Sequence, residues 1–307
     1  MPSIICLLTA CEGKEPLYQE QGYVFGTLVD VTVYGESEPR ARRAASEVLH
    51  EFQRLHNMLH AWQLNELNAA FAKGESKAVL AELAAMLQDA AQLSQQSQGL
   101  FNPAIGGLVQ LWGFHANEFK AALPDEKQIA ALVAAQPQMS DLVFNPSRPP
   151  LVRGGEVAPA PSPDKGRDGE GFEVRSRNKA MRHPRKPGAL APLELRDDEA
   201  IGTSGDYQRY FMLGDTRYCH LIDPRSGHPA QDVQAATVLT RGTRAGVLSD
   251  AVSKPLFIAG TGGWRAAAAQ MNLPEAMLVD DMGNIHLTAG LQKRLEFTDQ
   301  SIHPLVE

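Results

Sequence analysis

The chain has 307 residues, of which 43% are apolar and 21% are charged, and its formal net charge is −7. These values are typical of a globular protein with one large domain or two. The negative balance argues against a nucleic-acid partner, because such a partner requires a basic protein face. No apolar run in the sequence is long enough to span a membrane.

The amino terminus is an apolar run that ends in small residues before a cysteine. Leu8-Thr9-Ala10-Cys11 is typical of the end of a bacterial lipoprotein signal, although the Lys/Arg-bearing start of such a signal is absent. We expect residues 1–19 to be a remnant of this signal and a tether, with the lipid on Cys11. A short buried amino-terminal strand is the alternative. The cysteines form no CxxC pair, and Cys219 is interpreted as an inert apolar residue of a strand.

Hydrophobic periodicity predicts regular structure in two blocks, one from Tyr23 to Ala135 and one from His183 onward. In the first block we expect a strand at Tyr23–Tyr34 broken by Gly26, and helices at Pro39–Trp62, Ala78–Gln98, from Leu108 onward, and at Pro124–Ala135. In the second block we expect strands at Leu193–Leu195, Gln208–Leu213, Arg217–Ile222, Gln234–Thr240, Ala276–Val279 and Asn284–Leu287, and helices at Arg244–Ser253 and Trp264–Met271. The alternation predicts an α+β domain over residues 20–300, with helices packed on mixed, largely antiparallel sheets, and a tail at 301–307.

The segment 146–182 interrupts this pattern. Residues 146–187 hold 8 of the 20 prolines together with many arginines and glycines, and they show no period of 2 or 3.6. Taken alone, this composition predicts a disordered linker. A linker of this length inside a compact domain is itself unusual.

The stretch from Ile201 to Pro229 concentrates the polar residues of interest. Gly202 to Tyr207 is a run of small and hydroxyl residues, which we interpret as a turn whose backbone N–H groups could face an oxyanion. The predicted hairpin at 208–222 follows, and it brings His220 to the end of a strand, where an imidazole can exchange protons near pH 7. A structural hairpin between two polar turns is the alternative for any one of these residues.

Three motifs in this order resemble the ApbE-type FAD:protein FMN transferases. They are Leu108-Val109-Gln110-Leu111-Trp112-Gly113-Phe114, Thr203-Ser204-Gly205-Asp206-Tyr207 and His220-Leu221-Ile222-Asp223-Pro224-Arg225-Ser226-Gly227. The resemblance implies an enzyme that depends on Mg2+, cleaves FAD and transfers FMN to a Thr or Ser hydroxyl of an acceptor flavoprotein, releasing AMP. It covers most of residues 20–145 and 183–300.

The resemblance also implies roles for individual residues. His220 is the expected proton-transfer or orienting residue. The expected FAD contacts are Phe25, Trp62, Leu100, Phe101, Asn102, Thr203, Ser204 and Ile222. Ordinary core packing is the alternative for Trp62 and Phe101, and it is the favoured role for Trp112 and Phe114.

The resemblance also implies that Asp250 is a Mg2+ ligand, and hard oxygen ligands of this kind suit the cation. The family carries a Thr four residues after this Asp, whereas this chain has Lys254 there. A charged Lys donates hydrogen bonds only and cannot bind a metal ion. Either Ser253 substitutes imperfectly, or Lys254 supplies part of the charge neutralisation.

The segment 146–182 departs from the family pattern, which carries a Lys-Gly-Tyr element and a Gly-Gly strand there. The change of composition suggests a reading-frame disruption with loss of length, which resequencing of the DNA would test. Loss of a central strand would remove large buried side chains, each worth about 2–5 kcal/mol.

The sequence therefore predicts a periplasmic flavin transferase anchored to the bacterial inner membrane by a lipid on Cys11, with FAD and an extracytoplasmic flavoprotein as partners. A catalytically impaired FAD-binding lipoprotein is the first alternative, favoured by Lys254 and the segment 146–182. The second is a serine hydrolase that uses Ser204 and His220. Against it, the chain has no G-x-S-x-G elbow.

Overall fold

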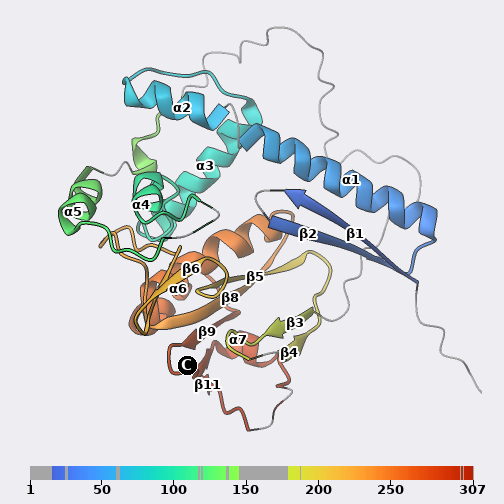
Figure 1. Cartoon of the computed structure of the whole chain (residues 1–307). Helices are drawn as coiled ribbons and strands as arrows, with labels where there is room; N and C mark the ends of the chain where they lie inside the picture. Colours follow the sequence, from blue (N-terminus) through green and yellow to red (C-terminus); the bar gives the residue numbers. More distant parts are fainter. Residues whose placement is uncertain are drawn as a thin grey trace, which may run out of the picture. The chain divides into compact units, whose positions relative to one another are not determined.

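The structure is a computed structural model that describes residues 16–24, 27–59, 63–116, 118, 120–135, 138–144, 179–186, 188–297, 299 and 301–306. The predictions for Cys11, Phe25, Trp62 and most of the segment 146–182 lie outside these residues. The described residues fall into two compact units, one up to Val79 and one from Leu80 onward. Their regular elements are drawn in Figure 1.

The amino-terminal unit is a β-hairpin covered by a helix. Strands β1 (Leu17–Val24) and β2 (Thr27–Tyr34) pair antiparallel, and α1 (Glu38–Asn57) lies alongside them, followed by α2 (Gln63–Ala72). The prediction of one broken strand at 23–34 was therefore wrong. Polar residues in Leu17–Val24 conceal an alternation of exposed and half-buried positions, so the first strand, which ends just before the predicted break, was not recognised.

The carboxy-terminal unit is built on a five-stranded sheet of order β11-β10-β9-β8-β5. Its strands are β5 (Glu199–Gly205), β8 (Val233–Arg241), β9 (Ala276–Asp280), β10 (Ile285–Leu287) and β11 (Leu305–Val306). The first four pair antiparallel, and β11 pairs parallel with β10. Residues 305–306 of the predicted tail thus contribute a short edge strand.

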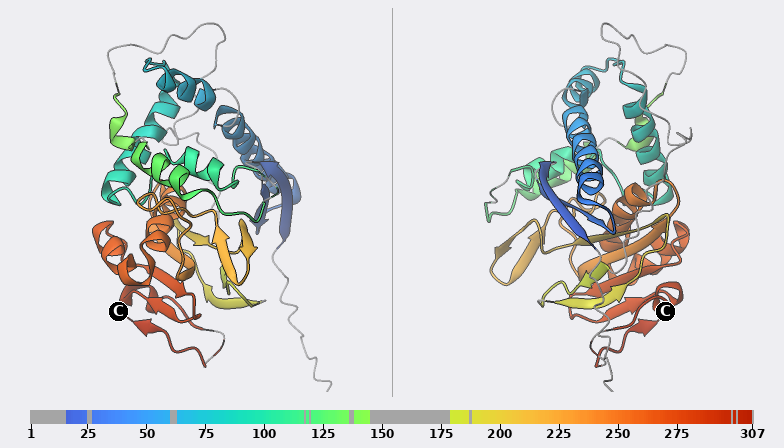
Figure 2. Two further views of the ribbon diagram at one scale, coloured as in Figure 1. Left: turned by 60° about the vertical axis from the view of Figure 1, so that its left-hand side comes forward. Right: turned by 90° about the vertical axis from the view of Figure 1, so that its right-hand side faces the viewer.

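Strands β8, β9 and β10 are buried on both faces of this sheet, and side chains alternate between the faces along each strand. On one face, Ala236, Val238 and Leu278 pack against α6 (Ala245–Gln270). On the other, Met277, Val279 and Leu287 pack against α7 (Ala289–Gln292) and the small hairpin β3 (Lys179–Arg182) with β4 (Ala189–Leu193). The two views of Figure 2 show the sheet between these layers.

A second apolar cluster surrounds the hairpin β6 (Tyr210–Leu213) with β7 (Thr216–Cys219). Helices α4 (Gly106–Leu111) and α5 (Glu126–Ala135) supply Leu108 and Ile129 to this cluster. Trp112 and Phe114 are each 3% exposed and stack with Phe211 or Tyr218, so their predicted role in the core is confirmed. Helix α3 (Ala81–Gln96) and the 3₁₀ helix η2 (Met139–Asp141) complete the unit.

The predicted α+β class with largely antiparallel sheets is confirmed, whereas several boundaries differ. Regular structure begins before His183, because β3 covers Lys179–Arg182, and the strand expected at Leu193–Leu195 is β4, which ends at Leu193. The helices predicted at 244–253 and 264–271 both lie within α6, which a kink at the non-helical Gly260 divides into two helical halves, each longer than predicted. Among the described residues, no helix is both long enough and apolar enough to cross a membrane.

Candidate functional site

Strand β5 and helix α6 form the centre of the candidate site, because their backbones approach closely. A Cβ on Gly202 would lie 2.3 Å from the carbonyl oxygen of Ser249 and 2.8 Å from the backbone nitrogen of Asp250. One turn further along the helix, the Ser253 hydroxyl lies 2.8 Å from the Ser204 hydroxyl. The missing side chain of Gly202 therefore allows β5 and α6 to pack closely, and this packing places Ser204 against the buried side of α6.

The run from Gly202 to Gly205 is a strand, so its interpretation as a turn was wrong. Every residue in it pairs with β8. Neighbouring side chains of a strand point to opposite faces, and Thr203 consequently lies away from α6, with its hydroxyl 2.9 Å from that of Thr237. The structure thus places Ser204 beside α6 and Thr203 on the other face of the sheet.

His220 lies directly after β7 and is held by the backbone of Arg209. Its backbone N–H donates to the Arg209 carbonyl oxygen at 3.0 Å, and its Nδ1 lies 3.3 Å from the same oxygen. Burial lowers the pKa of the imidazole, the bond to Arg209 opposes this shift, and the charges of Arg209 and Lys254 lower the pKa further, while Asp250 raises it. The imidazole is therefore neutral at pH 7 and close to the Asp250–Lys254 pair.

Asp250 and Lys254 form an ion pair on the outer side of α6. The Lys254 ammonium donates to Asp250 Oδ2 at 2.8 Å and to the Asp250 carbonyl oxygen at 2.8 Å. The Asp250 side chain is 78% exposed and that of Lys254 is 29% exposed. Of the two substitutes considered for the missing Thr, Lys254 is the one that contacts the carboxylate, because the Ser253 hydroxyl faces Ser204 and the Asp250 carbonyl oxygen.

A divalent cation finds a partial set of ligands in these residues. Mg2+ is commonly held by one or two carboxylates together with substrate phosphates, and the exposed carboxylate of Asp250 fits that requirement. Among the described residues, no three His, Cys, Asp or Glu side chains gather as a complete metal site. Substrate oxygens would therefore have to supply most of the coordination.

The predicted nucleotide turn follows α3. The Ser97 hydroxyl accepts from the backbone N–H of Phe101 at 3.0 Å, and Asn102 Oδ1 accepts from that of Ala104 at 3.0 Å. Asn102 is 5% exposed, and Phe101 packs on the cluster between the sheet and α6. Leu100 is half-buried. The turn is internally fixed, and Phe101 contributes to the core, which was its alternative role.

The motif that begins at His220 continues into a compact turn, which the first motif holds. The Gly227 N–H donates to the Asp223 carbonyl oxygen at 2.8 Å, and Trp112 Nε1 donates to the Gly227 carbonyl oxygen at 2.8 Å. Ile222 is 1% exposed and packs beside Trp112 and Phe114. Ile222 therefore offers almost no surface to a flavin, and its side chain belongs to the apolar core next to His220.

Sequence reasoning missed the ion pairs of Asp206, which closes the second motif. Asp206 is 8% exposed and receives both terminal nitrogens of Arg185, from the β3–β4 turn, one of them at 2.7 Å. Arg217 of β7 lies 3.9 Å from the same carboxylate and stacks over the ring of Tyr210. Asp206 therefore joins the β3–β4 turn to the hairpin that carries His220. No sequence spacing relates Arg185 to Asp206.

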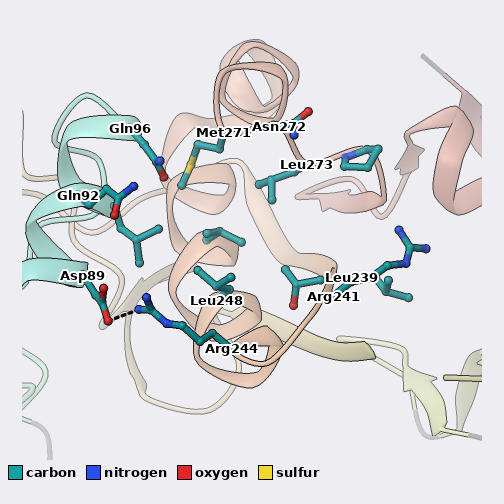
Figure 3. A pocket seen from close by; sticks show the side chains of 14 residues that line it. Asp89, Gln92, Gln96, Leu239, Arg241, Arg244, Leu248, Met271, Asn272 and Leu273 are labelled. Atoms are coloured by element: carbon teal, nitrogen blue, oxygen red, sulfur yellow. Dashed lines mark ion pairs between the residues drawn. The ribbon is translucent and has the colours of Figure 1, made fainter. Parts of the chain in front are cut away.

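A pocket of about 500 Å³ lies on a different side of α6 (Figure 3). Leu248 and Val252 form part of its wall, together with residues of α3 and the end of β8, and an ion pair between Arg244 and Asp89 lies at its edge. Residues two apart on a helix point about 200° apart, so this wall faces away from Asp250 and Lys254. None of the predicted site residues lines the pocket.

The hydroxyl of Ser204 and the imidazole of His220 do not form a nucleophile–base pair. Ser204 is bonded to Ser253, and the Nδ1 contact of His220 is with the Arg209 carbonyl oxygen. A serine hydrolase needs these two groups in contact and the His oriented by an acid. The geometry therefore gives that alternative no support.

Comparison of the sequence with protein families and with curated proteins shows which family the chain belongs to. The profile of the ApbE family matches residues 25–158 and 151–278. The chain is 36% identical over 310 residues to a Rhodobacter capsulatus protein named FAD:protein FMN transferase, covering 92% of this chain and 59% of that protein. It is 25% identical to a protein of the same name from Treponema pallidum (strain Nichols), covering 96% of this chain and 94% of that protein.

Solved structures show the same fold. The ApbE protein of Thermotoga maritima matches with a TM-score of 0.72 at 18% identity, covering 92% of this chain and all of that chain. The flavinyl transferase ApbE of Pseudomonas stutzeri, in its apo form, matches with a TM-score of 0.67 at 20% identity, covering 92% of this chain and 98% of that chain. With the profile matches and the 36% identical relative, these findings confirm the resemblance: the chain belongs to the ApbE family.

Proposed function

We propose that this chain transfers FMN from FAD to a Thr or Ser hydroxyl of an acceptor flavoprotein and releases AMP. The observation that supports the proposal is that two predicted site residues border the first half of α6: the Ser204 hydroxyl contacts Ser253, and the charges of Asp250 and Lys254 act on the imidazole of His220. It occurs in a member of the ApbE family whose 36% identical relative is named FAD:protein FMN transferase. A conserved fold alone would not carry the activity.

In the proposed reaction, the acceptor hydroxyl attacks the phosphorus of the FMN half of FAD. A new oxygen–phosphorus bond forms, the bond to the bridging pyrophosphate oxygen breaks, and AMP leaves with that oxygen. The neutral imidazole of His220 takes the proton of the attacking hydroxyl, since its pKa is lowered and Nδ1 is already engaged with Arg209. Asp206 keeps the hairpin that carries His220 in place through Arg217 and Arg185.

Negative charge builds up on the phosphate oxygens during this step. Mg2+ bound at Asp250 would neutralise part of that charge. Asp250 presents its carboxylate on the solvent side of α6, and Lys254 adds a second positive group there. The FAD-contact candidates that the structure describes are the 100–102 turn, Thr203, Ser204 and Ile222, and all of them stay predictions, as do Phe25 and Trp62.

The proposal includes a location. Leu8-Thr9-Ala10-Cys11 supports lipidation at Cys11 and hence an anchor at the periplasmic side of the bacterial inner membrane. There the chain would meet an extracytoplasmic acceptor flavoprotein. Intact-mass measurement of the protein from membranes tests this: a mass without a lipid on Cys11 would contradict it.

The alternative function is FAD binding without transfer. It is favoured by one observation, the ion pair in which Lys254 occupies Asp250 Oδ2. A site whose carboxylate stays neutralised would still bind the nucleotide but would neutralise less charge during cleavage.

The test is to incubate the full chain with FAD, Mg2+ and a candidate acceptor domain, and to look for flavin fluorescence on the acceptor in a denaturing gel. We expect a fluorescent acceptor, with loss of the signal after EDTA treatment or when the acceptor hydroxyl residue is replaced by Ala. His220→Gln should keep FAD binding and lose at least about a hundredfold in transfer rate. FAD binding without fluorescence on several acceptors would support the alternative, and transfer that survives EDTA would contradict the role of Mg2+.

A further inference from the structure

Lys254 lies within reach of Asp250 for a reason that the sequence fixes. The two residues are four apart on α6, and side chains at this spacing are neighbours on a helix surface. The helix continues through them, and Pro255 and Leu256, which follow, are buried. As long as this part of α6 is helical, the carboxylate of Asp250 therefore stays within reach of the Lys254 ammonium.

The contact engages oxygens that a cation would seek. Nζ lies 2.8 Å from Asp250 Oδ2 and 2.8 Å from the Asp250 carbonyl oxygen, and the Lys254 side chain is 29% exposed. An ammonium and a divalent cation compete for the same carboxylate, and they also repel each other across a few ångströms.

We propose that Lys254 is a tethered counter-cation of Asp250, which lowers the affinity of this site for divalent cations in competition with them. The effect of Lys254 on FMN transfer rests on the proposed function. Its effect on cation affinity does not, since the cation affinity of Asp250 is measurable without FAD or an acceptor. The ammonium serves as the resident positive charge of the site, and a divalent cation enters only when Lys254 moves aside. Lys254 thus acts through Asp250 and sets the Mg2+ concentration that the reaction requires.

The consequence is that removal of the ammonium strengthens metal binding. Lys254→Met keeps a long apolar stem without the charge, and Lys254→Thr adds a hydroxyl that can bind a cation. Mn2+ is the probe, because it accepts the oxygen ligands of Mg2+ and is visible by electron paramagnetic resonance. We expect both variants of the full chain to bind Mn2+ roughly tenfold more tightly than the unsubstituted chain.

Two controls separate this effect from a general change of charge. Lys127→Met removes an ammonium from the exposed surface of α5 and should leave the Mn2+ affinity unchanged within about twofold. Asp250→Asn combined with Lys254→Met should abolish the gain. A gain that survives this combination would place the cation elsewhere and overturn the proposal, as would Lys254→Met without a gain.

The flavin assay then separates the two levels of inference. If the function and the inference both hold, the Mg2+ concentration for half-maximal transfer falls in Lys254→Thr by the factor seen for Mn2+. If Mn2+ binds more tightly in both variants but none of the proteins transfers FMN, the proposed function fails and the role of Lys254 stands. If transfer occurs but the variants bind Mn2+ as weakly as the parent chain, the role of Lys254 fails alone.

Discussion

At the scale of single residues, the candidate site depends on a glycine that has no chemistry of its own. A Cβ on Gly202 would meet the carbonyl oxygen, carbonyl carbon and following nitrogen of α6 at 2.3 to 2.8 Å. These atoms are backbone and cannot rotate away, so any side chain here must push β5 from α6. The distance between Ser204 and Ser253 would change with it.

We expect Gly202→Ala to lower the free energy of unfolding by about 1–3 kcal/mol, because overpacking of a close backbone contact strains both elements. Urea denaturation of the full chain measures this value. Gly246→Ala is the matched control, since a Cβ there meets nothing within 4 Å and its backbone is helical. The control should leave stability unchanged or raise it slightly. Equal losses in the two variants would contradict the steric account.

The pKa of His220 gives a second prediction at this scale. Burial lowers the pKa of its imidazole below the ordinary value of 6.5. Protonation of His220 therefore favours the unfolded chain. The neutral imidazole costs no stability above about pH 6.5, and the free energy of unfolding decreases as the pH falls below about 6.5. NMR titration of the histidine Cε1 protons, with His220→Gln for assignment, measures the pKa. Lys254→Met should raise the pKa and Asp250→Asn should lower it, because each removes one nearby charge. A titration at or above 6.5 would contradict the buried setting.

At the scale of elements, α6 connects the site to the core. Its first half carries Ser253 and Asp250, and its second half carries Trp264, which is fully buried. Gly260 joins the halves with φ of 69° and ψ of −178°, a conformation that is almost restricted to glycine. The non-helical backbone of Gly260 thus agrees with the two separate helices that periodicity predicted here.

We therefore expect Gly260→Ala to destabilise the chain by about 1–3 kcal/mol. Gly262→Ala lies two residues further on, in helical backbone with nothing within 4 Å of an added Cβ, and should stabilise by up to about 1 kcal/mol. Thermal unfolding followed by circular dichroism compares the two variants. If Gly260→Ala were as stable as Gly262→Ala, the kink would not be a fixed feature of the helix.

Elements with strong periodicity were predictable from the sequence, and those set by tertiary contacts were not. Helix α3 and strand β8 lie where their apolar patterns predicted them. Thr203-Ser204-Gly205 has the composition of a turn, and only its pairing with β8 makes it a strand. The order of the three motifs identified the family. The ion pair of Asp206 was not predictable, because its partner Arg185 lies in the β3–β4 turn and no local pattern reveals such a long-range pair.

At the scale of the whole molecule, a buried charge network ties the start of the sheet to the carboxy-terminal segment. The Glu199 side chain is 1% exposed and accepts from Arg241 at 2.9 Å and from both terminal nitrogens of Arg294 at 2.9 Å. Arg241 also contacts Glu275 at 2.6 Å, just before β9. The network thus spans β5, β8, the entry to β9 and the residues after α7. It lies within the unit that carries His220 and Asp250.

This network makes stability depend on acid pH. The hydrogen bonds from Arg294 hold the pKa of Glu199 down at about 2, against an ordinary value of 4.5. A carboxylate with a lowered pKa contributes its full stability above pH 4.5, and the contribution is lost as the pH falls toward 2. We expect the unfolding free energy to fall by about 2–3 kcal/mol over this range because of Glu199.

Glu199→Gln should remove that part of the slope and cost about 3–5 kcal/mol at pH 7, since it leaves buried guanidinium charge without its partner. Urea denaturation between pH 2 and 7 measures both quantities, and Glu296→Gln, which is exposed, serves as the control with an unchanged slope. If Glu199→Gln kept the acid slope of the parent chain, the pH dependence would arise from other carboxylates and the network would have no special weight.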